Sequence, residues 1–144
     1  MGTTFAITLI LLVVAVVIAG IVVEKRLLGQ LSSSACTGRS WRRAFPKSSK
    51  QEIRDFYQLV LTSFGIGQRF HLRFTPDVKV MDLYRAVEPP VLSMGVDAME
   101  IETLCMEIEN RSGVDLSKCW NDELTLGELF ALTQSAGGLT ANRS

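Results

Sequence analysis

Three kinds of side chain in this sequence could do chemistry: three cysteines, a single histidine and an acidic segment over residues 97–109. Cys36, Cys105 and Cys119 are separated by 69 and 14 residues, which matches no zinc-binding pattern. His71 is the one histidine, and no clustered thiols accompany it. We therefore predict no metal site and interpret Cys105 as a small core residue within a helical apolar pattern.

The acidic segment offers no catalytic arrangement either. Asp97 and Glu100 could form a carboxylate pair, but an exposed helix end provides no burial to keep one of them protonated at neutral pH. No Ser-His-Asp or Cys-His set, phosphate-binding loop or dinucleotide-binding motif is present in the sequence. The sequence therefore predicts a protein that is not an enzyme and that binds no cofactor.

The acidic segment must be positioned by helices, because the apolar residues from residue 49 onward recur mainly at helical spacing. Ser49 with Glu52, and Thr125 with Glu128, match the capping box that opens a helix. Between the first two helices, Phe70, Leu72 and Phe74 alternate, which favours an extended stretch. The predicted helices are 49–64, a second that begins at Thr75-Pro76-Asp77 and stops at Glu88, 97–111 and 125–135.

These helices predict an all-α fold, a small antiparallel four-helix bundle over residues 49–136. Residues 137–144 are predicted to be a disordered tail.

Residues 5–23 are nineteen consecutive residues without a charge, and they predict a transmembrane helix within an anchor over residues 1–26. At ~1.5 Å per residue they give about 28 Å of helix, close to the ~30 Å hydrocarbon core. Basic residues lie only on the C-terminal side, so the prediction is a single-pass membrane protein with its N-terminus outside and its soluble domain in the cytoplasm. A cleaved signal peptide and a lipid on Cys36 are the alternatives.

Charge is divided along the chain although the net charge is zero. Residues 24–50 carry seven basic residues and one acid, whereas residues 51–144 carry eight basic and fourteen acidic residues. Residues 27–48 are rich in Ser and Gly and are interpreted as a flexible basic linker. The predicted lipid-interface residues within it are Trp41, Arg42, Arg43 and Phe45, and a solvated linker with two exposed aromatic rings is the alternative.

Residues 95–132 resemble the acyl carrier proteins. In that family a Gly-x-Asp-Ser-Leu motif opens the second major helix, and here Gly95-Val-Asp97-Ala98-Met99 occupies that place. Val114-Asp115-Leu116 resembles the apolar pair of the following loop, and Leu124-Thr125 resembles the start of the last helix. Ala98 stands where the family has the serine that carries phosphopantetheine, so the resemblance implies a carrier-like bundle without the attachment point.

The resemblance also implies a docking role, because carriers meet basic enzyme patches through the acidic second helix. The predicted docking residues are Asp97, Met99, Glu100, Glu102, Glu107 and Glu109. The predicted function is therefore a membrane-anchored, non-catalytic interaction module. Its predicted partners are a lipid bilayer and a basic protein, with no nucleic acid and no metal.

Three alternatives to specific docking stay open. The first is a working membrane-tethered carrier loaded at a non-standard serine, for which Ser93 and Ser112 are the nearest positions. The second is a small structural membrane protein of unrelated role. The third is that the acidic helix face is only solvated.

Overall fold

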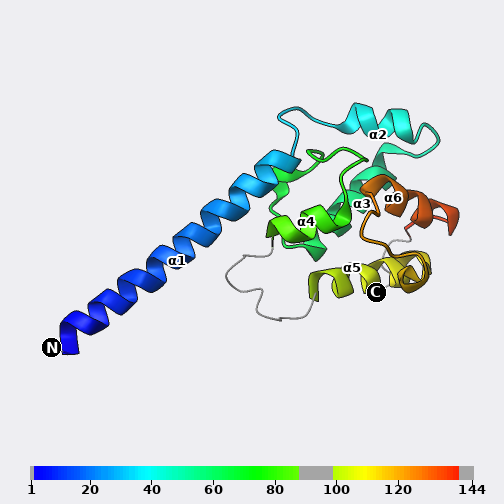
Figure 1. Cartoon of the computed structure of the whole chain (residues 1–144). Coiled ribbons are helices and arrows are strands. Elements are labelled where there is room, and N and C mark those ends of the chain that lie inside the picture. The colour runs from blue at the N-terminus through cyan, green and yellow to red at the C-terminus, as the bar shows by residue number, and fades with distance from the viewer. Residues whose placement is uncertain (1, 88–98, 140–144) are drawn as a thin grey trace.

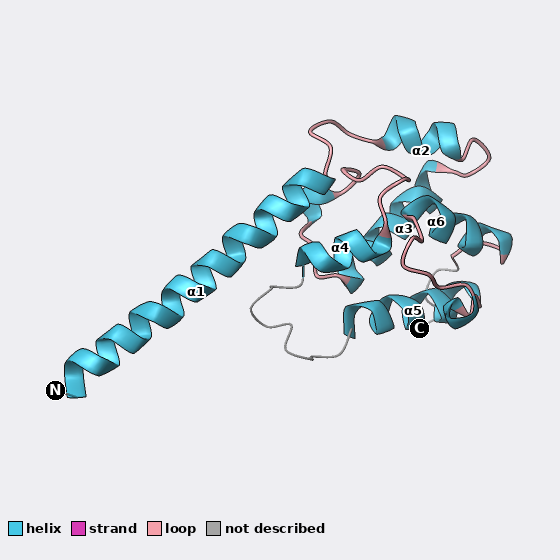
Figure 2. Cartoon of the chain, viewed as in Figure 1, coloured by secondary structure: helices cyan, strands magenta, loops and turns pink. Residues whose placement is uncertain are grey.

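The computed structural model describes residues 2–87 and 99–139, and Figure 1 shows a long helix that leads into a cluster of shorter ones. Within these ranges the regular elements are helices, with no strand, so the all-α prediction and the helical bundle are confirmed (Figure 2). The elements are α1 (Gly2–Leu31), α2 (Gly38–Ala44), α3 (Lys50–Ser63), η1 (Gln68–Phe70), α4 (Val80–Val87), α5 (Met99–Ser112), η2 (Leu116–Lys118) and α6 (Leu126–Ser135).

The two capping boxes lie at the predicted helix starts. Ser49 accepts a hydrogen bond from the backbone N–H of Glu52, whose carboxylate accepts one from the Ser49 N–H at 2.6 Å. Thr125 and Glu128 repeat this reciprocal arrangement at the start of α6. Each box satisfies N–H groups that have no partner within the helix, which fixes where α3 and α6 begin.

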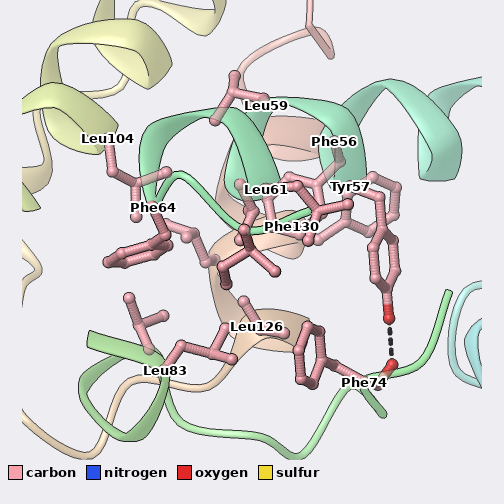
Figure 3. Packing of buried hydrophobic residues seen from close by; sticks show 14 of the residues in the cluster. Phe56, Tyr57, Leu59, Leu61, Phe64, Phe74, Leu83, Leu104, Leu126 and Phe130 are labelled. Atoms are coloured by element: carbon pink, nitrogen blue, oxygen red, sulfur yellow. Dashed lines mark hydrogen bonds between the residues drawn. The ribbon is translucent and has the colours of Figure 1, made fainter. Parts of the chain in front are cut away.

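The core lies between α3, α4, α5 and α6, and Figure 3 shows its side chains at close range. The α3 side of the core faces the α6 side. On α3 it consists of Phe56 and Leu61, together with Phe64 directly after the helix, and on α6 of Leu126 and Phe130. All five side chains are at most 3% exposed. Burying large apolar side chains is the dominant favourable term in folding, so these contacts hold the bundle together.

The second predicted helix begins later than the sequence suggests. Thr75-Pro76-Asp77 was expected to open it, but α4 begins at Val80. The preceding residues pair with the entry to α6 instead: the Pro76 and Val78 carbonyls accept the N–H groups of Gly127 and Leu126. An isolated antiparallel bridge joins Lys79 to Thr125. Backbone pairing across the bundle therefore replaces the first turn of that helix.

Gly127 is required where α6 passes over Pro76. A Cβ on residue 127 would lie 3.0 Å from the Pro76 Cβ and 3.1 Å from its carbonyl oxygen. We expect Gly127→Ala to lower the free energy of unfolding by about 1–3 kcal/mol, because the close backbone contact must open. Urea denaturation of the full chain measures this. Gly67→Ala is the matched control, since nothing lies within 4 Å of its added Cβ; equal losses in both variants would contradict the packing argument.

The expected extended stretch at residues 70–74 is instead a turn. It starts with the short helix η1, and Leu72 then adopts a positive φ of 53° before Phe74 enters the core with 0% exposure. The alternation of Phe70, Leu72 and Phe74 therefore reflects three apolar contacts made by a turn, and the extended prediction was wrong.

Helix α1 differs from the predicted transmembrane segment in where it ends and in what it contacts. It continues through Glu24, Lys25 and Arg26 to Leu31, and its last turns pack against α4, where Leu28 is 2% exposed. Its C-terminal end is thus part of the folded domain (Figure 1). Among the described residues, no helix combines the length and the apolar character needed to cross a membrane. The predictions of a single-pass anchor and of a membrane localisation were therefore wrong.

The segment interpreted as a flexible linker, residues 27–48, is folded over much of its length. It contains the end of α1 and all of α2, and Trp41 in α2 is 0% exposed. The Trp41 ring lies 5.3–5.9 Å from the rings of Phe45, Phe56, Tyr57 and Phe130. Aromatic contacts of this kind anchor α2 on α3 and α6.

A buried polar network fixes the same helix. The Phe74 carbonyl oxygen accepts hydrogen bonds from the Trp41 indole N–H at 3.0 Å, from the Thr37 hydroxyl at 2.8 Å and from the Tyr57 hydroxyl. Figure 3 shows the Tyr57 contact as a dashed line. Every buried donor in this group has an acceptor, which avoids the cost of an unpaired polar atom. Burial raises the pKa of Tyr57 to about 12.

The predicted disordered tail begins with an ordered cap. Gly137 and Gly138 have φ values of 103° and 82°, and their N–H groups donate to the carbonyls of Gln134 and Thr133. Glycine reaches this left-handed conformation without steric cost, so the pair closes α6. Residues 140–144 of the predicted tail lie outside the described residues.

Candidate protein-docking surface on helix α5

Helix α5 has a buried side and an exposed side. Leu104 and Ile108 are 0% exposed and face the core, where Figure 3 shows Leu104 near Phe64 at the end of α3. Met99 and Met106 are 62% and 58% exposed. In the described part of the chain outside α1, these two methionines are the large apolar side chains that are exposed.

The two methionines share one face. They are seven residues apart, which places them two turns and ~10.5 Å from each other along the helix. Methionine is flexible and polarisable, and it suits surfaces that adapt to a partner. We name the set Met99, Glu100, Glu102, Met106 and Glu109 the acidic methionine face. Met99, Glu102, Met106 and Glu109 share one side of the helix, and Glu100 lies at the edge toward the end of α3. All five side chains are exposed.

The glutamates on α5 divide into two groups. Glu107 lies 3.0 Å from the Nε of Arg111, in an ion pair on the side of α5 that borders Gln58 and Thr62 of α3. Within the described residues, Glu100, Glu102 and Glu109 enter no ion pair. The charge available to a partner therefore belongs to these three glutamates, and Glu107 acts within the fold.

The predicted docking residues are brought together in part. Met99, Glu102 and Glu109 share one exposed side of α5, whereas the exposed Glu100 and the half-buried Glu107 lie on the side that borders α3. Asp97 and Ala98, which carry the motif of the resemblance, lie outside the described residues, as does Ser93. Met106 was not predicted, although its position seven residues after Met99 was the signal that could have identified it.

The predicted lipid-interface residues separate into two kinds. Trp41 is fully buried, and Phe45 is half-buried with its ring 4.9 Å from that of Phe130. Both rings therefore belong to the core, and their interfacial role was wrongly predicted. Arg42 and Arg43, between them in sequence, are exposed. The four-residue spacing of Trp41 and Phe45 was the sequence signal for a helix with one apolar side.

His71 and Cys105, two residues that could do chemistry, both pack against other parts of the fold. His71 is half-buried with its ring 5.6 Å from that of Tyr57. Burial raises the pKa of the Cys105 thiol, and Cys119, Glu102 and Glu109 nearby raise it further, so this thiol is protonated at neutral pH. Over the described ranges, no three His, Cys, Asp or Glu side chains gather into a metal-binding group.

Ser112, one of the two serines considered for an attached carrier arm, is used within α5. Its hydroxyl donates to the Ile108 carbonyl at 2.7 Å, and the residue is half-buried.

No family model matches the chain, and no curated protein or solved structure is significantly similar to it. The fold and the surface define a small helical bundle that carries an acidic, methionine-bearing helix on its outside.

Proposed function

We propose that this protein is a non-catalytic interaction module with an acyl-carrier-like helical bundle, and that the acidic methionine face of α5 binds a basic protein. The observation that carries the proposal is the pair of exposed methionines flanked by Glu100, Glu102 and Glu109. The order of helices α3, α4, α5 and α6 supports the carrier-like interpretation, with a capping box at the first and the last of them.

The surface specifies the chemistry of its partner. The three carboxylates, which form no ion pair within the described residues, attract lysine and arginine side chains and orient their approach. This attraction raises the association rate more than the affinity. The methionines supply apolar area that is removed from water on binding, and this burial contributes affinity. The partner that fits both is an amphipathic basic segment, in which apolar side chains contact Met99 and Met106 and basic side chains contact the glutamates.

The test is photo-crosslinking from the centre of the face in the cells that make the protein. A benzoylphenylalanine replaces Met106 in the full chain, and crosslinked proteins are identified by mass spectrometry. We expect a discrete adduct that maps to a segment rich in Lys and Arg. We expect the triple variant Glu100→Lys, Glu102→Lys, Glu109→Lys to lower the adduct yield at least ~10-fold, because attraction becomes repulsion.

A matched control makes the same change in net charge at three exposed acidic residues outside α5. The triple variant Asp55→Lys, Asp77→Lys, Asp122→Lys should keep the adduct, since these residues lie outside α5. Circular dichroism and thermal unfolding verify that both variants are folded. Glu107 is left unchanged, which preserves its ion pair with Arg111. Equal losses of adduct in the two triple variants would refute docking through α5.

A further inference from the structure

A cavity of about 600 Å³ lies between α2, the first turns of α3 and the turn at Leu72, away from the acidic methionine face. Its charged lining is entirely basic: Arg39, Arg42 and Arg43 from α2, and Lys50 and Arg54 from α3. No acidic side chain lines it. We name it the basic cavity.

The five cations are not paired with acidic side chains of the described residues. In the described part of the chain, none of them enters an ion pair. The two acids nearest in sequence on α3 are engaged elsewhere: Glu52 accepts the N–H of Ser49, and Asp55 accepts from the Gln51 amide at 2.7 Å. Clustered like charges repel one another and raise the local concentration of anions. The basic cavity is thus a region of concentrated positive charge.

The cavity also has an apolar wall. Ile53, which is 3% exposed, and the half-buried Leu72 line it together with the exposed Cys36. Leu72 holds the left-handed backbone conformation, with φ 53°, which is uncommon for a residue with a branched side chain. Its carbonyl accepts the N–H of Thr37 at 2.8 Å, and it shares the Thr37 hydroxyl, at 2.9 Å, with the Phe74 carbonyl. The wall is therefore fixed by hydrogen bonds and is part of a preformed surface.

We propose that the basic cavity binds a dissolved phosphomonoester that carries a small apolar group. Guanidinium groups match the oxygens of a phosphate bidentately, and four of the five cations are arginines. The volume lies within the range of small-molecule sites, and it leaves room beside the phosphate for a group that contacts Ile53 and Leu72. This proposal is independent of docking through α5, because the two surfaces share no residue.

Calorimetric titration of the full chain with octyl phosphate tests the proposal. Inorganic phosphate, which lacks the apolar group, and octanol, which lacks the phosphate, are titrated for comparison. We expect octyl phosphate to bind at least ~10-fold more tightly than either. The double variant Arg42→Gln, Arg54→Gln should bind octyl phosphate at least ~10-fold more weakly than the wild type. The double variant Arg69→Gln, Arg85→Gln removes the same charge outside the cavity and should leave the affinity unchanged.

Cys36 provides a second readout at the cavity itself. It is exposed in the lining, whereas Cys105 and Cys119 are half-buried elsewhere. We expect octyl phosphate to slow alkylation of Cys36 by a maleimide and to leave the other two thiols unaffected.

Three results would overturn the proposal: equal weakening of octyl phosphate binding in both double variants, inorganic phosphate or octanol binding as tightly as octyl phosphate, and an alkylation rate of Cys36 that octyl phosphate does not change. Self-association of the chain that is lost in Arg42→Gln, Arg54→Gln would also overturn it, since a second copy would then supply the anion.

Discussion

Trp41→Ala is expected to lower the free energy of unfolding of the full chain by about 3–5 kcal/mol, as for other large aromatic side chains truncated in cores. The indole is 0% exposed, and its ring contacts four aromatic neighbours, Phe45 directly after α2, Phe56 and Tyr57 in α3, and Phe130 in α6. The substitution also removes a donor to the Phe74 carbonyl. Urea denaturation followed by far-ultraviolet circular dichroism measures the change.

The control for Trp41→Ala is Ser40→Ala, one residue earlier on the same helix. Ser40 is exposed, so its substitution should change the free energy of unfolding by no more than about 0.5 kcal/mol. If Trp41→Ala were as mild as Ser40→Ala, α2 would not be packed on the bundle in solution. The small change would be expected if the Trp41 ring were exposed, as the lipid-interface prediction from the sequence assumed.

Tyr57 is expected to make the protein sensitive to alkaline pH. Its pKa is about 12 in the folded protein against an ordinary value of 10.0, because burial disfavours the phenolate. Between these two values the folded state keeps a proton that the unfolded state has lost. The free energy of unfolding therefore falls as pH rises through this window, by about 1.5 kcal/mol between pH ~10 and ~11.5.

Comparison of the wild type with Tyr57→Phe isolates this contribution. The variant loses the hydroxyl, which we expect to cost about 1 kcal/mol at neutral pH. It should then lose about 2 kcal/mol less than the wild type on going from pH ~9 to ~11.5. Parallel stability curves for the two proteins over that range would contradict a buried, protonated Tyr57.

The parts of the fold that local rules determine were predictable. Helices α3 and α6 begin at capping boxes, and their bounds lie within a residue of the prediction because side chain and backbone there satisfy one another locally. The late start of α4 could not be predicted in the same way. Residues 76–80 pair with the entry to α6 almost fifty positions later, and no local pattern reports such a partner.

Composition misled the interpretation of α2 and α1. Residues 27–48 have the Ser and Gly content of a linker, yet a single tryptophan with a phenylalanine four residues later is enough to hold a short helix on the core. The predicted anchor ended at residue 26, whereas the same helix continues to Leu31 and its end packs on the folded domain. On α5, charge alone did not separate Glu107 from the other glutamates, because that depends on Arg111.

The burial of Trp41 also gives the protein an internal optical reporter. The sequence has two tryptophans, and the other, Trp120, is half-buried near η2. An indole enclosed by aromatic rings emits at shorter wavelength than one in contact with water, so undocking of α2 would shift the emission of Trp41 to the red. Replacing Trp120 by phenylalanine would leave Trp41 as the single tryptophan. The packing of α2 on the bundle could then be followed by its fluorescence without any attached dye.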